Sequence, residues 1–293
     1  MNFKHILFSL LFLSSAVSFA QSESSSVAPS TVIFFPPGLN FLPLRANNQE
    51  AKVGILYYPN TTNLKLDIGN TMDLLRFNLE QNKYITVGIE FMAYAYSVSF
   101  SQMRLQIGTL DGFFGGNAVY TNQLCGSRFS TRLRYLHNSA HLVDGFYSVN
   151  SGEWLNNKQP IPFTRDFAEV IFSDEFPYSG ITFRPYIGGS IATRQRPSLL
   201  KRSTFCAGAE AHTGDDSEPA FIHSHFFFAY HFLLAGLPVY QGSHQVQVGV
   251  KFGRWESKGV NFFLSYFNGN NMFNEFYYER INRFGVGFSI DFP

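Results

Sequence analysis

The residues with the clearest capacity for chemistry lie close together in the stretch 127–145, SRFSTRLRYLHNSAHLVDG. His137, Ser139 and His141 are spaced two residues apart, so on a β-strand their side chains project from the same face. A serine hydroxyl beside an imidazole is the pairing used for nucleophilic acyl transfer, in which the imidazole accepts the hydroxyl proton. The spacing therefore makes His137, Ser139 and His141 candidate residues of a hydrolytic site, with Asp144 as a further candidate.

The preceding part of this stretch indicates which way the row points. Arg132 and Arg134 alternate there with Leu133 and Tyr135. In a membrane β-barrel, arginines face the lumen and the other face meets lipid. The His–Ser–His row continues the lipid face, where polar side chains are costly unless they lie at the interface or serve a function. Two hypotheses stay open: a hydrolytic site, or a polar rim hydrogen-bonded to neighbouring strands and headgroups.

The His-x-Ser pair of His137 and Ser139 resembles the catalytic pair of the outer-membrane phospholipase A and lipid A 3-O-deacylase families. The resemblance implies a lipid acyl hydrolase that acts on phospholipid or lipid A. It also implies that Ser139 is the nucleophile and His137 its general base, with an Asn or Glu orienting the histidine and His141 and Asp144 in support. Neither family's longer serine-flanking motif occurs here, and Glu153 lies further from the serine than the deacylase acid does. The third member of a triad is therefore left open.

A second resemblance covers more of the chain. The run HNSAHLVDG, with FFPPGLNFLPLRANNQE upstream and a Gly-rich closing strand, is similar to a Gram-negative exported family described only as a domain of unknown function. That family has the motif H-x-S-S-H-L-G-D-E. The matching positions are His137, Ser139, His141, Leu142 and Asp144, and the departures are Ala140, Val143 and Gly145. The resemblance implies an outer-membrane location and no particular activity.

The composition agrees with a membrane barrel. Aromatic residues make up 17% of the chain and charged residues 15%, against roughly 25% charged in a soluble domain. A mean hydropathy of -0.05 argues against a bundle of membrane helices. The net charge of +1 gives no reason to expect nucleic acid as a partner. No dinucleotide fingerprint, phosphate loop or complete set of metal ligands is recognised, so neither a cofactor nor a metal is expected.

Period-two alternation predicts the fold. From Phe284 to Phe292, large apolar residues alternate with small or polar ones, as in a strand with one face toward lipid and one toward the lumen. We therefore predict an all-β, antiparallel transmembrane β-barrel of about twelve strands, with ten or fourteen as alternatives. The strands are expected at 63–76, 83–96, 101–109, 116–122, 127–142, 166–176, 180–192, 203–212, 220–233, 244–254, 258–267 and 277–292.

The N-terminal part of the chain has a different composition. Residues 1–20 combine a basic start, an apolar run and a small-x-small ending, which predicts a removable signal peptide. Residues 21–50 are expected to form a flexible, Pro-containing periplasmic lead-in, and 51–293 the barrel. Residues 51–58 resemble a strand that either extends the barrel or belongs to the lead-in. The partners expected of an exported barrel are outer-membrane lipid and, during biogenesis, the barrel-assembly machinery.

The connections predict which end of the barrel faces outward. If the last strand ends in the periplasm, the short connections near 97–100, 123–126, 177–179 and 255–257 are periplasmic. The long connection 143–165 then lies outside. A barrel of this size with many charged lumen residues is expected to be plugged rather than open. The alternative to a lipid hydrolase is a non-enzymatic barrel, either structural or passing small solutes. The two cysteines, Cys125 and Cys206, are expected to be unpaired.

Overall fold

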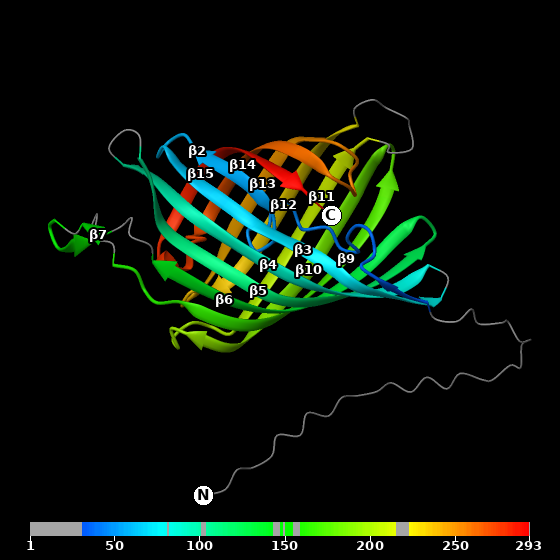
Figure 1. Cartoon of the computed structure of the whole chain (residues 1–293), viewed down its shortest axis with the longest axis horizontal. Helices are drawn as coiled ribbons and strands as arrows, with labels where there is room; N and C mark the ends of the chain where they lie inside the picture. Colours follow the sequence, from blue (N-terminus) through cyan, green and yellow to red (C-terminus); the bar gives the residue numbers. More distant parts are fainter. Residues whose placement is uncertain are drawn as a thin grey trace, which may run out of the picture.

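The computed structural model describes residues 31–80, 82–100, 104–142, 147–148, 150–154, 159–214 and 223–292. Within these residues, twelve wall strands form one antiparallel sheet in which each strand pairs with the next along the chain. The last wall strand also pairs with the first, so the sheet closes into a barrel (Figure 1). The predicted all-β fold and the predicted number of twelve strands are confirmed.

The wall strands follow one another around the barrel in sequence order. They are β2 (Val53–Tyr58), β3 (Asn63–Glu80), β4 (Lys83–Phe100), β5 (Arg104–Leu124), β6 (Ser127–Leu142), β9 (Thr164–Tyr178), β10 (Ile181–Arg196), β11 (Ser203–Thr213), β12 (Ser224–Gly236), β13 (Tyr240–Phe252), β14 (Gly259–Asn270) and β15 (Arg280–Asp291). A separate hairpin of β7 (Tyr147–Ser148) and β8 (Glu153–Trp154) projects beyond one end of the barrel in Figure 1. We call the end where β15 terminates the Asp291 end, and the opposite end the Ser139 end.

The two faces of each strand differ as the period-two pattern predicts. On β12, Phe226 is 68% exposed on the outside, whereas Phe227 beside it is 4% exposed on the inside. The stripe on β15 behaves in the same way, with Phe284 42% and Phe288 38% exposed. Arg134, in contrast, is buried within the barrel. The outer surface is therefore largely apolar, and charged side chains are gathered in the lumen.

The number of strands is as predicted, but two predicted strands form the single strand β5 and one further strand, β2, is not counted in the prediction. The single strand β5 covers residues 104–109 and 116–122 of two predicted strands, because its pairing with β4 and β6 continues through glycines such as Gly115 that interrupt the alternation. Residues 101–103 lie outside the described residues. The missing strand is supplied by the segment 51–58, which contains β2. Residues 97–100, predicted as a short connection at the end where the last strand terminates, belong instead to β4 and lie at the Ser139 end.

The segment before β2 is not a free lead-in where the structure describes it. From the sequence we expect residues 21–50 to be flexible, but β1 (Val32–Phe34) pairs with β3 at Leu75–Phe77. β2 pairs with the same edge of β3, at Asn63–Asp67. The chain between these two pairings leaves the wall and enters the lumen, where Leu44 is 0% exposed. We call this part, residues 36–52, the inner segment.

Charged side chains of the lumen hold the inner segment in place. Two guanidinium nitrogens of Arg132 donate to the carboxylate of Glu50, at 2.8 and 2.5 Å. Arg134 donates to the carbonyl oxygen of Gln49 at 3.0 Å. A guanidinium buried in a barrel is costly without acceptors. The wall strands supply part of these acceptors, since Arg134 also donates to Glu169 at 2.8 Å and to Glu90 at 3.2 Å. The inner segment supplies the remaining ones, and these bonds hold it in the lumen.

The ion pairs change the titration of the inner segment. Burial alone would raise the pKa of Glu50, but the attraction of Arg132 and Arg134 outweighs burial and lowers this pKa to about 2. Glu50 is therefore ionised at neutral pH. Burial lowers the pKa of the nearby Lys52 to about 8.

The connection between β14 and β15 closes the lumen from the Ser139 end. It contains one short turn, η3 (Asn274–Phe276), in which the side-chain amide of Asn274 donates to Asn138 Oδ1 at 3.2 Å. The hydroxyl of Tyr94 donates to the carbonyl oxygen of Met272 at 2.9 Å. Over the described residues, the lumen is thus filled by chain from both ends. No helix among the described residues is long and apolar enough to cross a membrane.

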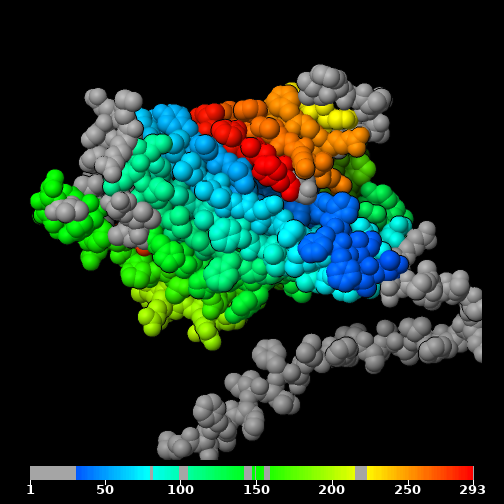
Figure 2. Space-filling model, in the orientation of Figure 1, coloured from blue at the N-terminus to red at the C-terminus, as the bar shows by residue number. Residues whose placement is uncertain are grey.

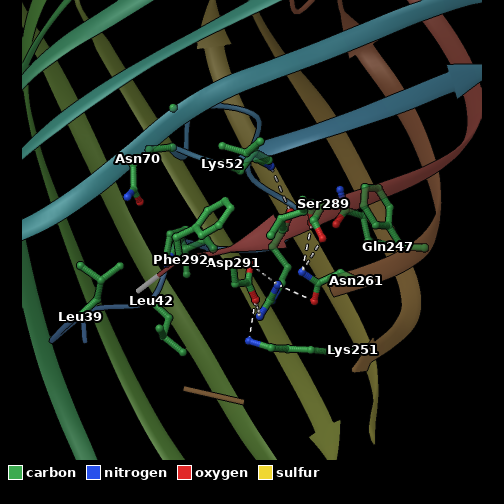
Figure 3. A pocket seen from close by; sticks show the side chains of 18 of the residues that line it. Leu39, Leu42, Lys52, Asn70, Gln247, Lys251, Asn261, Ser289, Asp291 and Phe292 are labelled. Atoms are coloured by element: carbon green, nitrogen blue, oxygen red, sulfur yellow. Dashed lines mark hydrogen bonds and ion pairs between the residues drawn. The ribbon is translucent and has the colours of Figure 1, made fainter. Parts of the chain in front are cut away.

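A small pocket marks the place where the inner segment leaves the wall. Figure 3 shows Asn70 of β3 and Phe292 after β15 at its margins, with Leu39 of the inner segment beside them. Lys251 donates to Asp291 at 2.6 Å nearby. In Figure 2, the N-terminal residues (blue) reach the surface next to the end of β15 (red). The inner segment therefore enters the lumen beside the end of β15, where β3 continues past the short strand β2.

Candidate functional site

The candidate residues of β6 lie on the outer face, near the Ser139 end. Leu136 and Asn138 are 1% and 0% exposed and point into the barrel. Since neighbouring residues on a strand point to opposite faces, His137 and Ser139 point outward, and His141 follows them on that face. Ladders to β5 and β9 hold this part of β6 on both sides. The structure therefore agrees with the prediction that His137, Ser139 and His141 point away from the lumen.

His137 is held by a carboxylate from the neighbouring strand. It lies directly opposite Asp166 of β9, and its Nδ1 is 2.6 Å from Asp166 Oδ1. The two side chains are 34% and 20% exposed, so the pair is accessible from outside the barrel. The imidazole also contacts the ring of Phe114 on β5, with centroids 4.9 Å apart. A carboxylate at Nδ1 orients the imidazole and leaves Nε2 for another partner.

Ser139 forms its hydrogen bond with the other histidine. Its Oγ is 2.9 Å from Nε2 of His141, whereas the sequence predicts His137 as its base. Asp144, the fourth residue predicted for the site, lies outside the described residues. The structure thus brings together a hydroxyl, an imidazole in contact with it, and a second imidazole backed by a carboxylate. We call Ser139, His141, His137 and Asp166 the wall cluster.

The neighbouring strands leave space around the serine. The cross-strand partner of Ser139 on β5 is Gly112. A Cβ at this glycine would meet only the carbonyl oxygen of Ser139, at 3.9 Å. On the other side, the hydroxyl of Thr164 on β9 donates to the carbonyl oxygen of Asn138 at 3.1 Å. The Ser139 hydroxyl is therefore open from the β5 side, where a substrate can approach it.

Asp166 is the residue of the wall cluster that we did not predict from the sequence. It follows His137 by 29 positions, beyond the long connection between β6 and β9. One signal was present: Asp166 is an acid near one end of a strand face whose middle residues, Ala168, Val170 and Phe172, are apolar. Linking that acid to His137 requires the register of β6 against β9, which alternation alone does not specify.

The remaining candidate residues do not form a second centre in the part of the chain that the structure describes. Cys125 is exposed at a turn and Cys206 is buried in the lumen, and both are free thiols. Within the described ranges, no group of three or more His, Cys, Asp or Glu side chains is arranged to hold a metal ion.

A comparison with protein families identifies a match over most of the chain. A family model described as a protein of unknown function, DUF1207, matches residues 34–292. The matched range includes the inner segment, all of the wall strands and the wall cluster. No curated protein matches this chain.

Similar solved structures come from bacterial outer-membrane proteins. The beta domain of the Bordetella autotransporter BrkA has 13% sequence identity and a TM-score of 0.42, with 82% of this chain and 96% of that chain covered. The outer-membrane expressed OmpT of Vibrio cholerae has 9% identity and a TM-score of 0.33, with 85% and 99% covered. A bacterial polysaccharide outer membrane secretin has 9% identity and a TM-score of 0.33, with 82% and 98% covered.

Proposed function

The chain belongs to the DUF1207 family, and from its barrel and its wall cluster we propose an integral outer-membrane protein that hydrolyses an acyl ester of an envelope lipid. The observation that carries this proposal is the pairing of Ser139 with His141 on the outer face, beside a His137 that is held by Asp166. A hydroxyl, two imidazoles and a carboxylate on the lipid-facing side of a barrel wall supply the nucleophile and the proton acceptor that acyl transfer from a membrane lipid uses.

The surface of the barrel supports the membrane location. Exposed apolar side chains occur on nearly every wall strand, among them Ile68, Val87, Ile89, Phe114, Leu133, Phe172, Ile187, Phe205, Phe226, Val248, Phe262 and Val286. Such a continuous apolar surface is stable in hydrocarbon rather than in water, and the closed ladder satisfies the backbone groups that lipid cannot.

The connections support an orientation with the wall cluster in the outer leaflet. The longest one, between β6 and β9, lies at the Ser139 end, and outer-membrane barrels carry their long loops on the outside. Residues 1–20, which we predict to direct export, lie outside the described residues.

In the proposed reaction, Ser139 Oγ attacks the carbonyl carbon of the lipid ester while Nε2 of His141 takes the hydroxyl proton. The tetrahedral intermediate expels the alcohol of the lipid, which receives that proton, and the acyl group stays on Ser139. Water then attacks the acyl-serine as His141 takes a proton from it. The fatty acid leaves, and the proton returns to Ser139 Oγ.

The pair of His137 and Asp166 has a second role in this scheme. Ser139 lies between two imidazoles on one strand face, so His137 Nε2 is available on the side away from His141. An imidazolium formed there is stabilised by the Asp166 carboxylate. We assign to His137 the general-base role when the Ser139 hydroxyl turns toward it, and His137 then takes and returns the same protons in place of His141.

Acyl release by the folded, full-length chain tests the proposal. The substrates are phosphatidylglycerol, phosphatidylethanolamine and lipid A in mixed micelles. Ser139→Ala is expected to lower the rate by about 10³-fold or more. The matched control is Ser203→Ala, which removes an exposed hydroxyl at the same end and is expected to leave the rate unchanged. Equal rates for wild type and Ser139→Ala on all three lipids would exclude the hydrolase.

A structural barrel without enzymatic activity is the alternative. The filled lumen favours it over a barrel that passes small solutes, since Glu50 and Asn274 occupy the interior from opposite ends. Planar lipid bilayers containing the protein are expected to show no stepwise ion conductance. Regular conductance steps would instead favour a solute pathway through the lumen.

A further inference from the structure

Two rows of residues cross the outer face of the wall from β6 to β10. Each row passes from a residue of the wall cluster, through β9, to an arginine. By strand register, the rows are His137–Asp166–Arg194 and, nearer the Ser139 end, Ser139–Thr164–Arg196. Since paired residues in an antiparallel ladder project from one face, both arginines share the outward face of the wall cluster.

A third guanidinium lies beside these two. Arg202, just before β11, donates through Nη1 to the carbonyl oxygens of Thr193 at 3.0 Å and Ala192 at 3.3 Å. These carbonyls lie at the β10 bulge that precedes Arg194. We call Arg194, Arg196 and Arg202 the arginine group, and all three are exposed. Among the described residues, the side chains of Arg194 and Arg196 have no hydrogen-bond or ion-pair partner.

From this arrangement we propose that the arginine group binds the phosphate of an anionic lipid headgroup. Guanidinium groups bind phosphate oxygens through paired, charge-assisted hydrogen bonds, which diacylglycerol does not offer. A zwitterionic headgroup such as that of phosphatidylcholine offers the phosphate but carries beside it a cation that the arginines repel. Asp166 is the carboxylate paired with Arg194 across the strands, and it is already bonded to His137. Its single negative charge is smaller than the three positive charges of the arginine group, so this part of the surface is positive overall. The site is thus selective for lipids with net negative charge.

The spacing of the strands places the phosphate at a useful distance from the serine. β6 and β10 are separated by β9, and adjacent strands lie about 4.8 Å apart, so Ser139 and Arg196 are about 10 Å apart along the wall. A phosphate held at the arginine group therefore leaves the glycerol or sugar ester linkages of the same lipid over Ser139. The identification of the ester as a substrate rests on the proposed function, whereas the binding of the headgroup does not.

The surface beside the arginine group favours a lipid, and not a free phosphate ion, as the source of the bound phosphate. Ile191 on β10 and Leu133 on β6 are 54% and 55% exposed, and both lie on the outer face toward the middle of the wall. Acyl chains that extend from a phosphate at the arginine group would lie against these side chains. A free phosphate ion gains nothing from them, because apolar contact requires the chains.

Binding to the full-length Ser139→Ala protein in nanodiscs tests the inference without hydrolysis. The probes are phosphatidylglycerol, phosphatidylcholine and diacylglycerol with identical acyl chains, measured by native mass spectrometry. Phosphatidylglycerol is expected to bind about tenfold more tightly than the other two. The double variant Arg194→Gln/Arg196→Gln is expected to abolish this preference. Equal binding of the three lipids would overturn the inference.

A matched variant separates the site from general electrostatics. Arg254→Gln/Lys258→Gln also removes two exposed positive charges, but at the Asp291 end, and is expected to retain the preference. If both double variants lose the preference for phosphatidylglycerol equally, the site is not at the arginine group. If equimolar inorganic phosphate displaces phosphatidylglycerol completely, the bound group is free phosphate and not a lipid headgroup. If the protein with Ser139 intact binds phosphatidylglycerol selectively but releases no fatty acid, the proposed hydrolase is wrong and the headgroup site remains supported.

Discussion

Asp166 and His137 are direct cross-strand partners on the outer face of the barrel, and Asp166 Oδ1 lies 2.6 Å from His137 Nδ1. The ladder between β6 and β9 fixes both backbones, so the carboxylate needs no loop movement to reach the imidazole. This bond defines which ring nitrogen faces the substrate side. It also explains why the third catalytic candidate lies on the following wall strand, and not within the sequence motif that carries Ser139.

Replacing Asp166 by Asn is expected to impair acyl release while the barrel stays intact. The amide keeps the size of the side chain but loses the charge that stabilises an imidazolium at His137. We expect kcat to fall by about 10²-fold or more with KM little changed. Asp174→Asn is the control, since Asp174 lies on the same face of β9 toward the Asp291 end. An unchanged kcat in Asp166→Asn would remove the pair from the mechanism.

Alternation in the sequence predicted most of the wall because each strand of a barrel has two different environments. The apolar faces of β4, β12 and β15 follow that rule, and their strands lie where we expected them. The rule is weaker at β5, where glycines such as Gly112 occupy the outer face and give no hydropathy signal. The prediction therefore divided β5 in two.

The inner segment illustrates what alternation cannot predict. Its sequence is rich in proline and polar residues, which is typical of a flexible linker. Its folded position depends on Arg132 and Arg134, which are more than eighty positions away in the sequence. The arginines were correctly predicted to face the lumen, but their acceptors were not identified. Partners of buried charges follow from the three-dimensional arrangement and not from local pattern.

Filling the space opposite Ser139 is expected to block the substrate. Gly112→Phe places a ring on the outer face of β5, where the Cβ has room, so the barrel should fold normally. The ring would cover the side from which the Ser139 hydroxyl is open, and we expect kcat/KM to fall by about tenfold or more. The matched control is Gly126→Phe at the opposite end, whose Cβ would also meet open space although its φ of 81° adds backbone strain. Equal activity of Gly112→Phe and wild type would place the substrate elsewhere.

The ion pair between Glu50 and Arg132 is expected to stabilise the filled barrel. Both groups are buried, and removing one deprives the other of its main partner, although Arg132 keeps a contact with Glu169 at 3.4 Å and Glu50 keeps one with Arg134 at 3.7 Å. The expected loss is therefore about 3 kcal/mol, the lower end of the cost of breaking a buried ion pair. We expect Arg132→Met and Glu50→Gln each to lower the free energy of unfolding by this amount, measured by urea-induced unfolding of the protein in lipid vesicles. The double variant should lose much less than the sum of the two. Additive losses would show that the two side chains do not act as a pair.

The same ion pair gives the barrel a defined sensitivity to acid. The pKa of Glu50 is about 2 in the folded chain against an ordinary value of 4.5. A carboxyl whose pKa is lowered by folding contributes stability that is present above its unfolded value and is lost as the pH falls toward its folded value. The contribution is on the order of 3 kcal/mol.

Unfolding measured from pH 7 to pH 2 for wild type and Glu50→Gln tests this expectation. The difference in unfolding free energy between the two proteins should be constant above about pH 5 and should shrink between pH 4.5 and 2, where the wild-type carboxylate takes up a proton. Comparing the two proteins removes the contribution of every other titrating group that they share. A difference that stays the same down to pH 2 would mean that Glu50 does not carry the charge that holds the inner segment against Arg132 and Arg134.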